Sequence, residues 1–356
     1  MQGIKLRNSN IELLRILCML GVVILHYNNP IIGGGLQAVI PGSINQTIMR
    51  ILECSCISAV NLFVLISGYF YISNNKRSIY KPISLLFLNV LVKFAFLLVN
   101  VYSGQSVFSA NDALRCMLPD NWFINLYVVM YLISPFINKV IEAIDSRKQY
   151  LLVVILLACF SFEPILIDLF GACVGEDPRR MSFVGLYGHG EGYTIVQFVM
   201  MYVIGAVIKK NEKRLKEISK YTYIIPCLII CVIINTVWYS REVISPFAIE
   251  YCNPLVILEA IALFMIFIKM KTFNSRVINA LAKGAFMVYL IHGNLLAFFK
   301  IPEYVVRSPK VYVLHTGVTV ITIYLFGWFI NLLYSLCAKP VSTFIKKHVK
   351  IPEYEV

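Results

Sequence analysis

One apolar stretch near the N-terminus, RILCMLGVVILH, carries Arg15 and His26, separated by ten uncharged residues. Eleven helical steps of about 100° each make roughly three turns, so both side chains would share one helix face, about 16 Å apart along its axis. Glu12 is close enough in sequence to pair with Arg15. The face therefore offers a cation at one end of a path and a titratable base at the other. The alternative is an arginine that snorkels to the interface and a histidine that merely ends the helix.

Further ionisable residues lie in apolar stretches. A charge at mid-bilayer costs about 2.5 kcal/mol or more, so each needs a reason. Glu259 lies in LEAIALF, where we hypothesise a buried partner for Arg15 or another channel cation, with an inward-facing structural carboxylate as the alternative. His292 lies with Asn294 in AFMVYLIHGNLL, in the predicted outer half of the bilayer.

The elements that must position these groups are membrane helices. The 356 residues are 59% hydrophobic and 14% charged, whereas soluble domains are nearer to about a quarter charged. Residues 1–340 are predicted to form an all-α integral membrane protein, a single bundle of about ten transmembrane helices, followed by a basic cytoplasmic tail at residues 341–356. The ten apolar runs of membrane-spanning length are 11–27, 57–73, 83–101, 122–138, 150–167, 194–208, 222–239, 253–268, 284–299 and 311–336.

The net charge of +13 is explained by topology. With the N-terminus in the cytoplasm, the inner segments hold 22 of the 32 Lys and Arg residues and the outer loops hold 8. This asymmetry follows the positive-inside rule and predicts a multi-pass protein of the plasma (inner) membrane with both termini cytoplasmic. Anionic membrane lipids are the expected partner of the basic face, and nucleic acid is not needed to explain it.

The ten cysteines show no metal-ligand spacing, so no metal is expected. Five of them fall at or beyond the predicted outer surface, which allows one or two disulfides there. These are Cys54, Cys56, Cys116, Cys173 and Cys252.

Two further runs contain polar or aromatic motifs. The run at 57–73 includes NLFVLISGYFYI, with Asn61, Ser67 and Gly68, and its SGY could be a packing notch for a neighbouring helix. The run at 122–138 opens NWFINLYVVMYLISPFIN, in which Trp122 and Tyr127 would pass as an aromatic belt plus core.

Taken together, five ordered stretches resemble the membrane acyltransferase-3 family. They are IELLRILCMLGVVILH, FVLISGYF, WFINLYVVMYLISPFIN, FVMMYVIGAVIKK and VYLIH, and the resemblance covers nearly the whole chain. Members of that family move acyl groups, usually acetyl, onto extracytoplasmic sugars, often with about ten spans. An arginine and a histidine spaced like Arg15 and His26 are the family's hallmark.

The resemblance carries roles to single positions. It implies that His26 is the essential histidine and Arg15 the essential arginine. The other matched positions are Ser67, Gly68 and Tyr69 in the second run, Trp122 in the fourth, and Tyr289 and His292 in the ninth. Many members have paired arginines after the second span; here the loop reads NNKRSIYKP, so Arg77 and Lys81 are only approximate counterparts.

The implied donor is cytoplasmic acetyl-CoA, whose phosphates Arg15 would bind together with Arg77 or Lys81, with Ser67 nearby. The implied acceptor is a hydroxyl of a surface polysaccharide, such as a capsule or exopolysaccharide, or of its lipid-linked precursor. His26 would act as general base or as acyl carrier, and the sequence does not separate the two. Candidates for contacting the substrate or the developing oxyanion are Asn61, Tyr69, Trp122, Tyr127 and His292, with Glu12 and Glu259 in support.

Two other functions compete with this one. A non-catalytic transporter or flippase would use the same polar path, but neither an inverted repeat nor paired broken helices is evident in the sequence. A sensor or antibiotic-resistance module would carry a fused cytoplasmic catalytic domain. The sequence leaves the sugar, its hydroxyl, the acyl group and the oligomeric state open.

Overall fold

The computed structural model describes residues 8–175, 183–184, 190–348 and 352–356, and each of the ten apolar runs folds as a helix. The long helices are α1 (Ser9–Asn28), α3 (Ile44–Cys56), α4 (Ala59–Tyr71), α5 (Tyr80–Tyr102), α7 (Trp122–Ala143), α8 (Ser146–Leu157), α9 (Glu163–Val174), α10 (Ile195–Lys210), α12 (Tyr221–Tyr239), α14 (Pro254–Lys269), α16 (Ala285–Leu296) and α18 (Pro309–His348). The short elements are α2 (Gly35–Ala38), α6 (Ala110–Cys116), α11 (Glu212–Ile218), α13 (Ser245–Ala248), α15 (Arg276–Ala282), α17 (Ile301–Val305), and the strands β1 (Lys76–Ser78) and β2 (Glu353–Glu355).

The predicted all-helical membrane fold is confirmed, apart from one short antiparallel strand pair. Within the described residues, seven helical segments are long and apolar enough to cross a membrane, and the bent pair α15–α16 makes an eighth. The helices α10 and α14 have 16 residues each and would span only about 24 Å, less than a typical hydrocarbon core of about 30 Å. The count of ten spans therefore stays a prediction.

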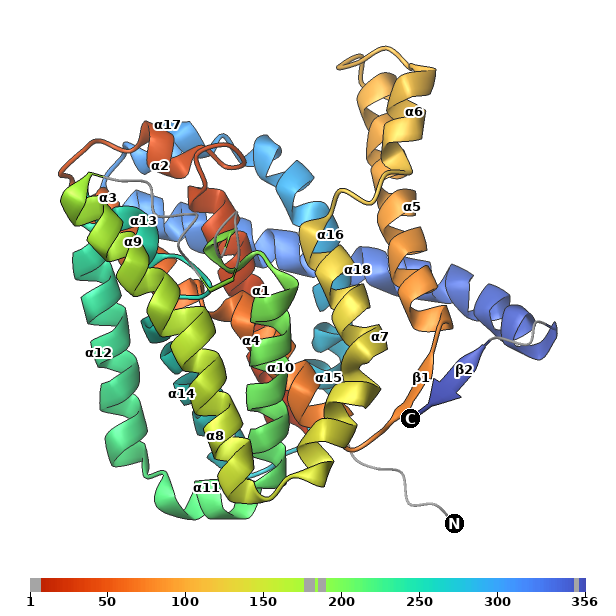
Figure 1. Cartoon of the computed structure of the whole chain (residues 1–356). Coiled ribbons are helices and arrows are strands. Elements are labelled where there is room, and N and C mark those ends of the chain that lie inside the picture. The colour runs from red at the N-terminus through yellow and green to blue at the C-terminus, as the bar shows by residue number, and fades with distance from the viewer. Residues whose placement is uncertain (1–7, 176–182, 185–189, 349–351) are drawn as a thin grey trace.

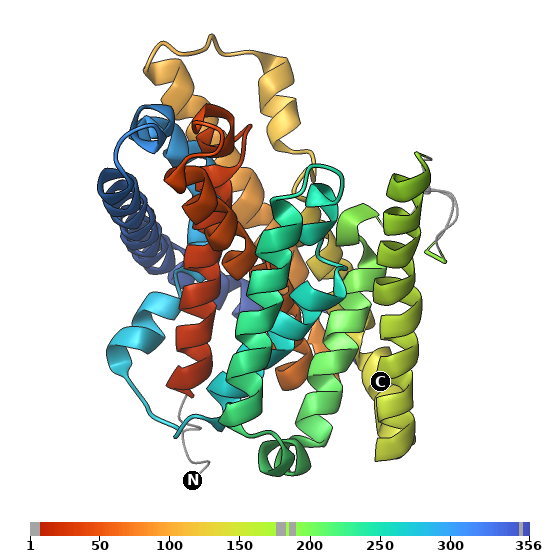
Figure 2. The same cartoon turned by 90° about the vertical axis from the view of Figure 1, so that its left-hand side faces the viewer.

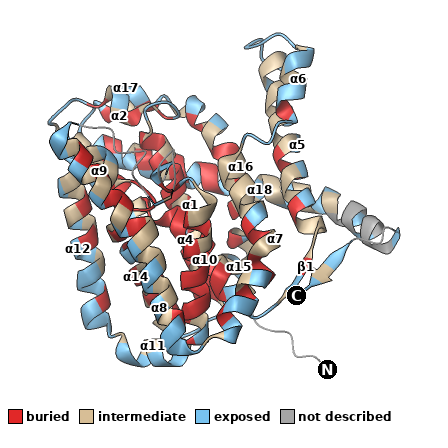
Figure 3. Ribbon diagram, viewed as in Figure 1, coloured by how far each residue is buried: buried red, intermediate tan, exposed pale blue. Residues whose placement is uncertain are grey.

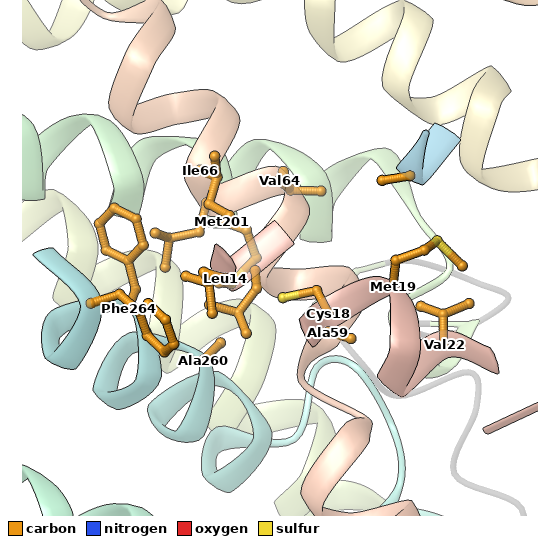
Figure 4. Packing of buried hydrophobic residues seen from close by; sticks show 14 of the residues in the cluster. Leu14, Cys18, Met19, Val22, Ala59, Val64, Ile66, Met201, Ala260 and Phe264 are labelled. Atoms are coloured by element: carbon orange, nitrogen blue, oxygen red, sulfur yellow. The ribbon is translucent and has the colours of Figure 1, made fainter. Parts of the chain in front are cut away.

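The buried core lies where α1, α4, α10 and α14 meet (Figure 3). Leu14 and Cys18 of α1 lie beside Ala59 of α4 and Ala260 of α14 (Figure 4). Because α1 packs against helices on several sides, the directions in which its side chains point are fixed. The peripheral helices carry the lipid-facing surface, as the exposed residues Ile225, Ile229, Ile233 and Val237 along one face of α12 illustrate.

Reciprocal glycines bring the backbones of α4 and α10 into contact. A Cβ added at Gly68 would lie 2.0 Å from the carbonyl oxygen of Tyr202, and one added at Gly205 would lie 2.1 Å from that of Leu65. Only glycine fits at both positions, which is the geometry of small-residue helix packing in membranes. The glycine of the SGY motif therefore forms a packing notch for a neighbouring helix, as one interpretation of the sequence had predicted.

Connections alternate between the two ends of the bundle. The helix α11 and the α7–α8 turn lie at the lower end in Figure 1, and α2 and α17 at the upper end. The start of α1 also lies at the lower end (Figure 2), and β2 lies in the lower half of the view in Figure 1. This agrees with the alternation derived from the charges, while the assignment of the lower end to the cytoplasm stays a prediction.

All ten cysteines are free. The sequence left disulfides among the outer cysteines open, and none is formed in this structure. Cys54 and Cys252 are both buried, and the Sγ of Cys252 donates to Glu250 Oε2 at 3.5 Å.

Candidate active site

A cavity of about 990 Å³ follows one face of α1 through the bundle. Its lining includes Glu12, Arg15, Met19, Val22 and His26, which recur every three or four residues along that helix. The other walls come from α3, α4, α5, α7 and α16, and from the segments around residues 191–193 and 246–251. The predicted shared face of Arg15 and His26 is thus a wall of one continuous cavity.

At the lower end of this wall, Arg15 pairs with Glu12. Its Nη1 donates to Glu12 Oε1 at 3.0 Å, and the guanidinium lies over the ring of Phe70, 5.6 Å from the centroid. The arginine side chain is 30% exposed and the carboxylate only 8%. A partly exposed guanidinium held by a buried carboxylate keeps N–H groups available to the cavity.

Lys81, at the start of α5, enters the same cavity inside a cage of tyrosines. Its Nζ donates to the hydroxyls of Tyr71 and Tyr127, and lies 4.8 Å from the centroid of the Tyr131 ring. Within the described residues no carboxylate pairs with it. Lys209 provides a contrast, because it pairs with Glu212 at 2.7 Å. Lys81 is therefore a cation held by neutral groups and cation–π contacts, with its charge uncompensated.

Arg77 points away from the cavity. It lies on β1, is 2% exposed, and donates from Nε to Ser134 Oγ at 2.8 Å and from Nη1 to the carbonyl of Lys76 at 2.9 Å. Its guanidinium also lies over the ring of Tyr71. Of the two approximate counterparts of the family's arginine pair, only Lys81 reaches the cavity, and Arg77 instead supports the tyrosine that holds Lys81.

At the upper end, His26 meets His292. The Nε2 of His292 lies 2.9 Å from the Nδ1 of His26, and the ring centroids are 4.6 Å apart. His292 is 6% exposed and His26 is half buried, and both line the cavity. Tyr289, one turn before His292, donates its hydroxyl to Asn121 Oδ1 at 2.8 Å, which joins α16 to the cap of α7.

The glycine-rich loop after α1 helps to fix the position of His26 in the last turn of that helix. A Cβ added at Gly33 would lie 2.2 Å from the carbonyl oxygen of Tyr27 and 2.6 Å from that of His26. The loop can approach the last turn of α1 this closely only with glycine there. Because the loop backbone touches the carbonyl of His26 itself, the sequence GGG helps to position the histidine.

The upper part of the cavity is aromatic and carboxylate-lined. Trp122 packs against Tyr193 at 4.5 Å between centroids and stacks on Tyr251 at 5.9 Å. Glu53 is 6% exposed, lines the cavity, and accepts a hydrogen bond from Asn28 at 3.0 Å. The sequence interpretation missed Tyr193, Tyr251 and Glu53. The available signal for Glu53 was the presence of an asparagine at 45 and a carboxylate at 53 in one amphipathic helix.

Three other predicted residues have polar groups that make hydrogen bonds within the protein. Ser67 lines the cavity, but its hydroxyl donates to the carbonyl of Phe63 at 2.9 Å. The amide of Asn61 is buried and donates to the carbonyl of Tyr251. Tyr69 is buried and accepts from Lys209 at 3.4 Å.

Glu259 corrects one hypothesis. Its side chain is fully buried, and Oε1 accepts from the hydroxyl of Ser58 at 2.7 Å. Its other oxygen, Oε2, has no hydrogen-bond partner within the described residues. Arg15 instead pairs with Glu12, so the proposed Glu259–Arg15 pair is wrong.

A protein-family model described as an acyltransferase domain matches residues 8–338, nearly the whole chain. Comparisons with curated proteins and with solved structures found no match. The matched range contains both ends of the cavity, from Glu12 on α1 to His292 on α16.

Proposed function

Because the chain belongs to the acyltransferase-3 family and is a multi-pass membrane acyltransferase, we propose that it moves an acetyl group from cytoplasmic acetyl-CoA to a sugar hydroxyl outside the cell membrane. The acceptor is a surface polysaccharide, such as a capsule or exopolysaccharide, or its lipid-linked precursor. The observation that carries the proposal is the single cavity with cations at one end and His26 at the other.

The donor would enter at the lower end of the cavity. A nucleotide carrying phosphates favours cations whose charge is not already neutralised, and Lys81 is such a cation. Arg15 adds guanidinium donors on the facing helix. From there a pantetheine arm would reach along α1 toward His26, about 16 Å further along the helix axis. A long, thin donor suits a long cavity lined by one face of a helix.

The reaction would take place at the upper end. A sugar hydroxyl is a weak nucleophile at neutral pH, so a base must take its proton as the thioester carbonyl is attacked. His26 is the half-buried imidazole that lines the cavity at that depth. The aromatic side chains of Trp122, Tyr193 and Tyr251 give a sugar ring apolar faces to pack against, and Glu53 and Asn29 give its hydroxyls polar partners.

The test uses cells that make the native polysaccharide. Membranes containing wild type or His26→Ala receive labelled acetyl-CoA, and the label in the polysaccharide is counted. Loss of a general base costs about a hundredfold to ten-thousandfold, so we expect label in the mutant sample close to background.

His315→Ala is the matched control. His315 also lies near the outer end, where its Nδ1 meets the Tyr27 hydroxyl at 2.8 Å, but it does not line the cavity. It should transfer label like wild type. Equal transfer by His26→Ala and wild type would refute the catalytic assignment, and movement of an unmodified solute by His26→Ala would favour a transporter.

A further inference from the structure

The two facing histidines have hydrogen-bond partners that determine where their protons lie. A neutral imidazole has one N–H donor and one lone-pair acceptor, and backbone carbonyl oxygens only accept. Each histidine has a backbone carbonyl near one ring nitrogen, on the turn before it. These carbonyls make it possible to assign the protons from the heavy atoms alone.

His292 is assigned first. Its Nδ1 lies 2.7 Å from the carbonyl oxygen of Tyr289 and 3.1 Å from that of Val288. Two acceptors at this nitrogen require that it carry a proton. In the neutral ring the Nε2 of His292 is then a lone-pair acceptor, and this is the nitrogen that faces His26.

His26 follows from that assignment. Its Nδ1 lies 2.9 Å from the Nε2 of His292 and 2.9 Å from the carbonyl oxygen of Val22. Both neighbours are acceptors, so the proton between the rings belongs to His26 Nδ1. If His292 instead donated from Nε2, the Nδ1 lone pair of His26 would face the Val22 carbonyl at 2.9 Å, which is repulsive. Only the first arrangement satisfies all of these atoms.

We propose that His292 is a positioning residue that holds His26 as the Nδ1–H tautomer, so that the Nε2 of His26 is the reactive atom. Within the described residues Nε2 makes no hydrogen bond. His26 lines the cavity and its Nδ1 side is occupied by α16 and its own helix, which leaves Nε2 for the substrates. His292 thus takes the place that an aspartate holds behind the histidine in serine hydrolases.

This assignment removes one role from His292. Both of its ring nitrogens are used, one by the backbone of α16 and one by His26, so it has no N–H left to donate to an oxyanion. Among the predicted oxyanion candidates, Trp122 remains at the upper end of the cavity, because the Tyr127 hydroxyl belongs to the Lys81 cage at the lower end.

The catalytic meaning of the tautomer rests on the proposed acetyl transfer. In the general-base route the hydroxyl proton moves to Nε2 as the new C–O bond forms. The C–S bond then breaks, and the proton returns from Nε2 to the departing thiolate, giving an acetyl ester and a free thiol. In the acyl-carrier route Nε2 attacks the thioester carbonyl, the C–S bond breaks, the thiolate leaves, and the Nδ1 proton passes to His292 Nε2. The sugar hydroxyl then attacks the acetyl carbon, the C–N bond breaks, His292 returns its proton to Nδ1, and the hydroxyl proton passes to the thiolate. Both routes use the same nitrogen.

The tautomer can be measured without any substrate. The chain has five histidines, so protein labelled only with ¹⁵N-histidine gives a simple long-range ¹H–¹⁵N spectrum in detergent. The His26 signals are assigned by their loss in His26→Ala. We expect a protonated Nδ1 and an unprotonated Nε2 on His26 in wild type. A protonated Nε2 there would overturn the proposal.

Variants at His292 test its part. In His292→Ala the His26 signals should shift to a mixture of tautomers, whereas His292→Gln, whose side-chain oxygen can accept from Nδ1–H, should keep the wild-type pattern. An unchanged tautomer in His292→Ala would overturn the positioning role. Each variant is shown to be folded by two measurements: its size after cross-linking in detergent, and its binding of labelled acetyl-CoA.

Kinetics supply the second measurement. His292→Ala should lower kcat for label transfer at least about tenfold with KM for acetyl-CoA unchanged, because the wrong tautomer in a serine protease costs about ten-thousandfold. His292→Gln should recover most of that loss, and a His292→Ala enzyme with wild-type kcat would overturn the proposal. A correct tautomer in a protein that transfers no label from any donor would refute the proposed function alone.

Discussion

The close contact between α4 and α10 predicts that alanine lowers the stability of the protein at a glycine in this contact and raises it at a glycine with open space around it. Gly68→Ala places a methyl group 2.0 Å from the carbonyl oxygen of Tyr202, and ordinary contact begins near 3.4 Å. The two helices must therefore separate by more than an ångström, against a backbone atom that cannot rotate away. Gly317 in α18 is the control, because a Cβ there meets nothing within 4 Å.

The magnitudes follow from this geometry. Overpacking a tight interface costs typically about 1–3 kcal/mol, and a clash with backbone places Gly68→Ala at about 3 kcal/mol. Gly205→Ala clashes with Leu65 at 2.1 Å and should cost a similar amount. One separation of α4 from α10 relieves both clashes, so the double mutant should lose less than the two single losses added together. Gly317→Ala should gain about 0.5–1 kcal/mol from backbone entropy.

The assay is the fraction of protein that stays monodisperse in detergent after heating. Its midpoint should fall for Gly68→Ala and Gly205→Ala and should stay level or rise for Gly317→Ala. A Gly68→Ala protein that melts with wild type would refute the tight contact. Equal damage from Gly317→Ala would show that the loss reflects glycine in general and not the notch.

Two further predictions concern charge in the cavity. Lys81→Met should raise KM for acetyl-CoA about tenfold or more, because a hydrogen bond to a charged group contributes about 1.5–3 kcal/mol. Lys81→Arg should keep most of the affinity. A wild-type KM for Lys81→Met in the label-transfer assay would exclude Lys81 from donor binding. Glu12→Gln should lower the amount of label transferred, because it removes the carboxylate that holds Arg15. Glu259 is a fully buried carboxyl that does not line the cavity, so Glu259→Gln should transfer label within about twofold of the wild-type amount. Reversed results for the two glutamates would mean that Glu259, and not Glu12, supports the cation.

The features that depend on helix periodicity could be predicted from the sequence. The common face of Arg15 and His26 depends only on eleven helical steps, and the cavity follows that face. Apolar runs located the helices for the same reason. The start of the second span was placed at residue 57, whereas the helical segment begins at Ile44. Its first part is polar, so hydropathy alone assigned the buried Glu53 to a loop.

Tertiary neighbours were beyond the reach of the sequence. Arg77 and Lys81 are both basic residues in one short loop, and nothing local says which one faces the cavity. The difference arises because β1 turns Arg77 toward Ser134 while Lys81 begins α5. The meeting of His26 and His292 joins residues 266 positions apart. A motif can identify each histidine, but only the packing of α1 on α16 brings the rings together.

The strand pair β1–β2 has a consequence for how the protein is made. Lys76–Ser78 pairs with Glu353–Glu355, and Lys76 forms an ion pair with Glu353. Residues 353–355 are synthesised well after β1, and at about 5–20 residues per second they follow it by roughly 15–55 s. During that interval α4 and α5 can already occupy the membrane while the segment between them lacks its partner strand. The support beneath the Lys81 cage is therefore completed only after β2 has been made, later than the helices on either side of β1.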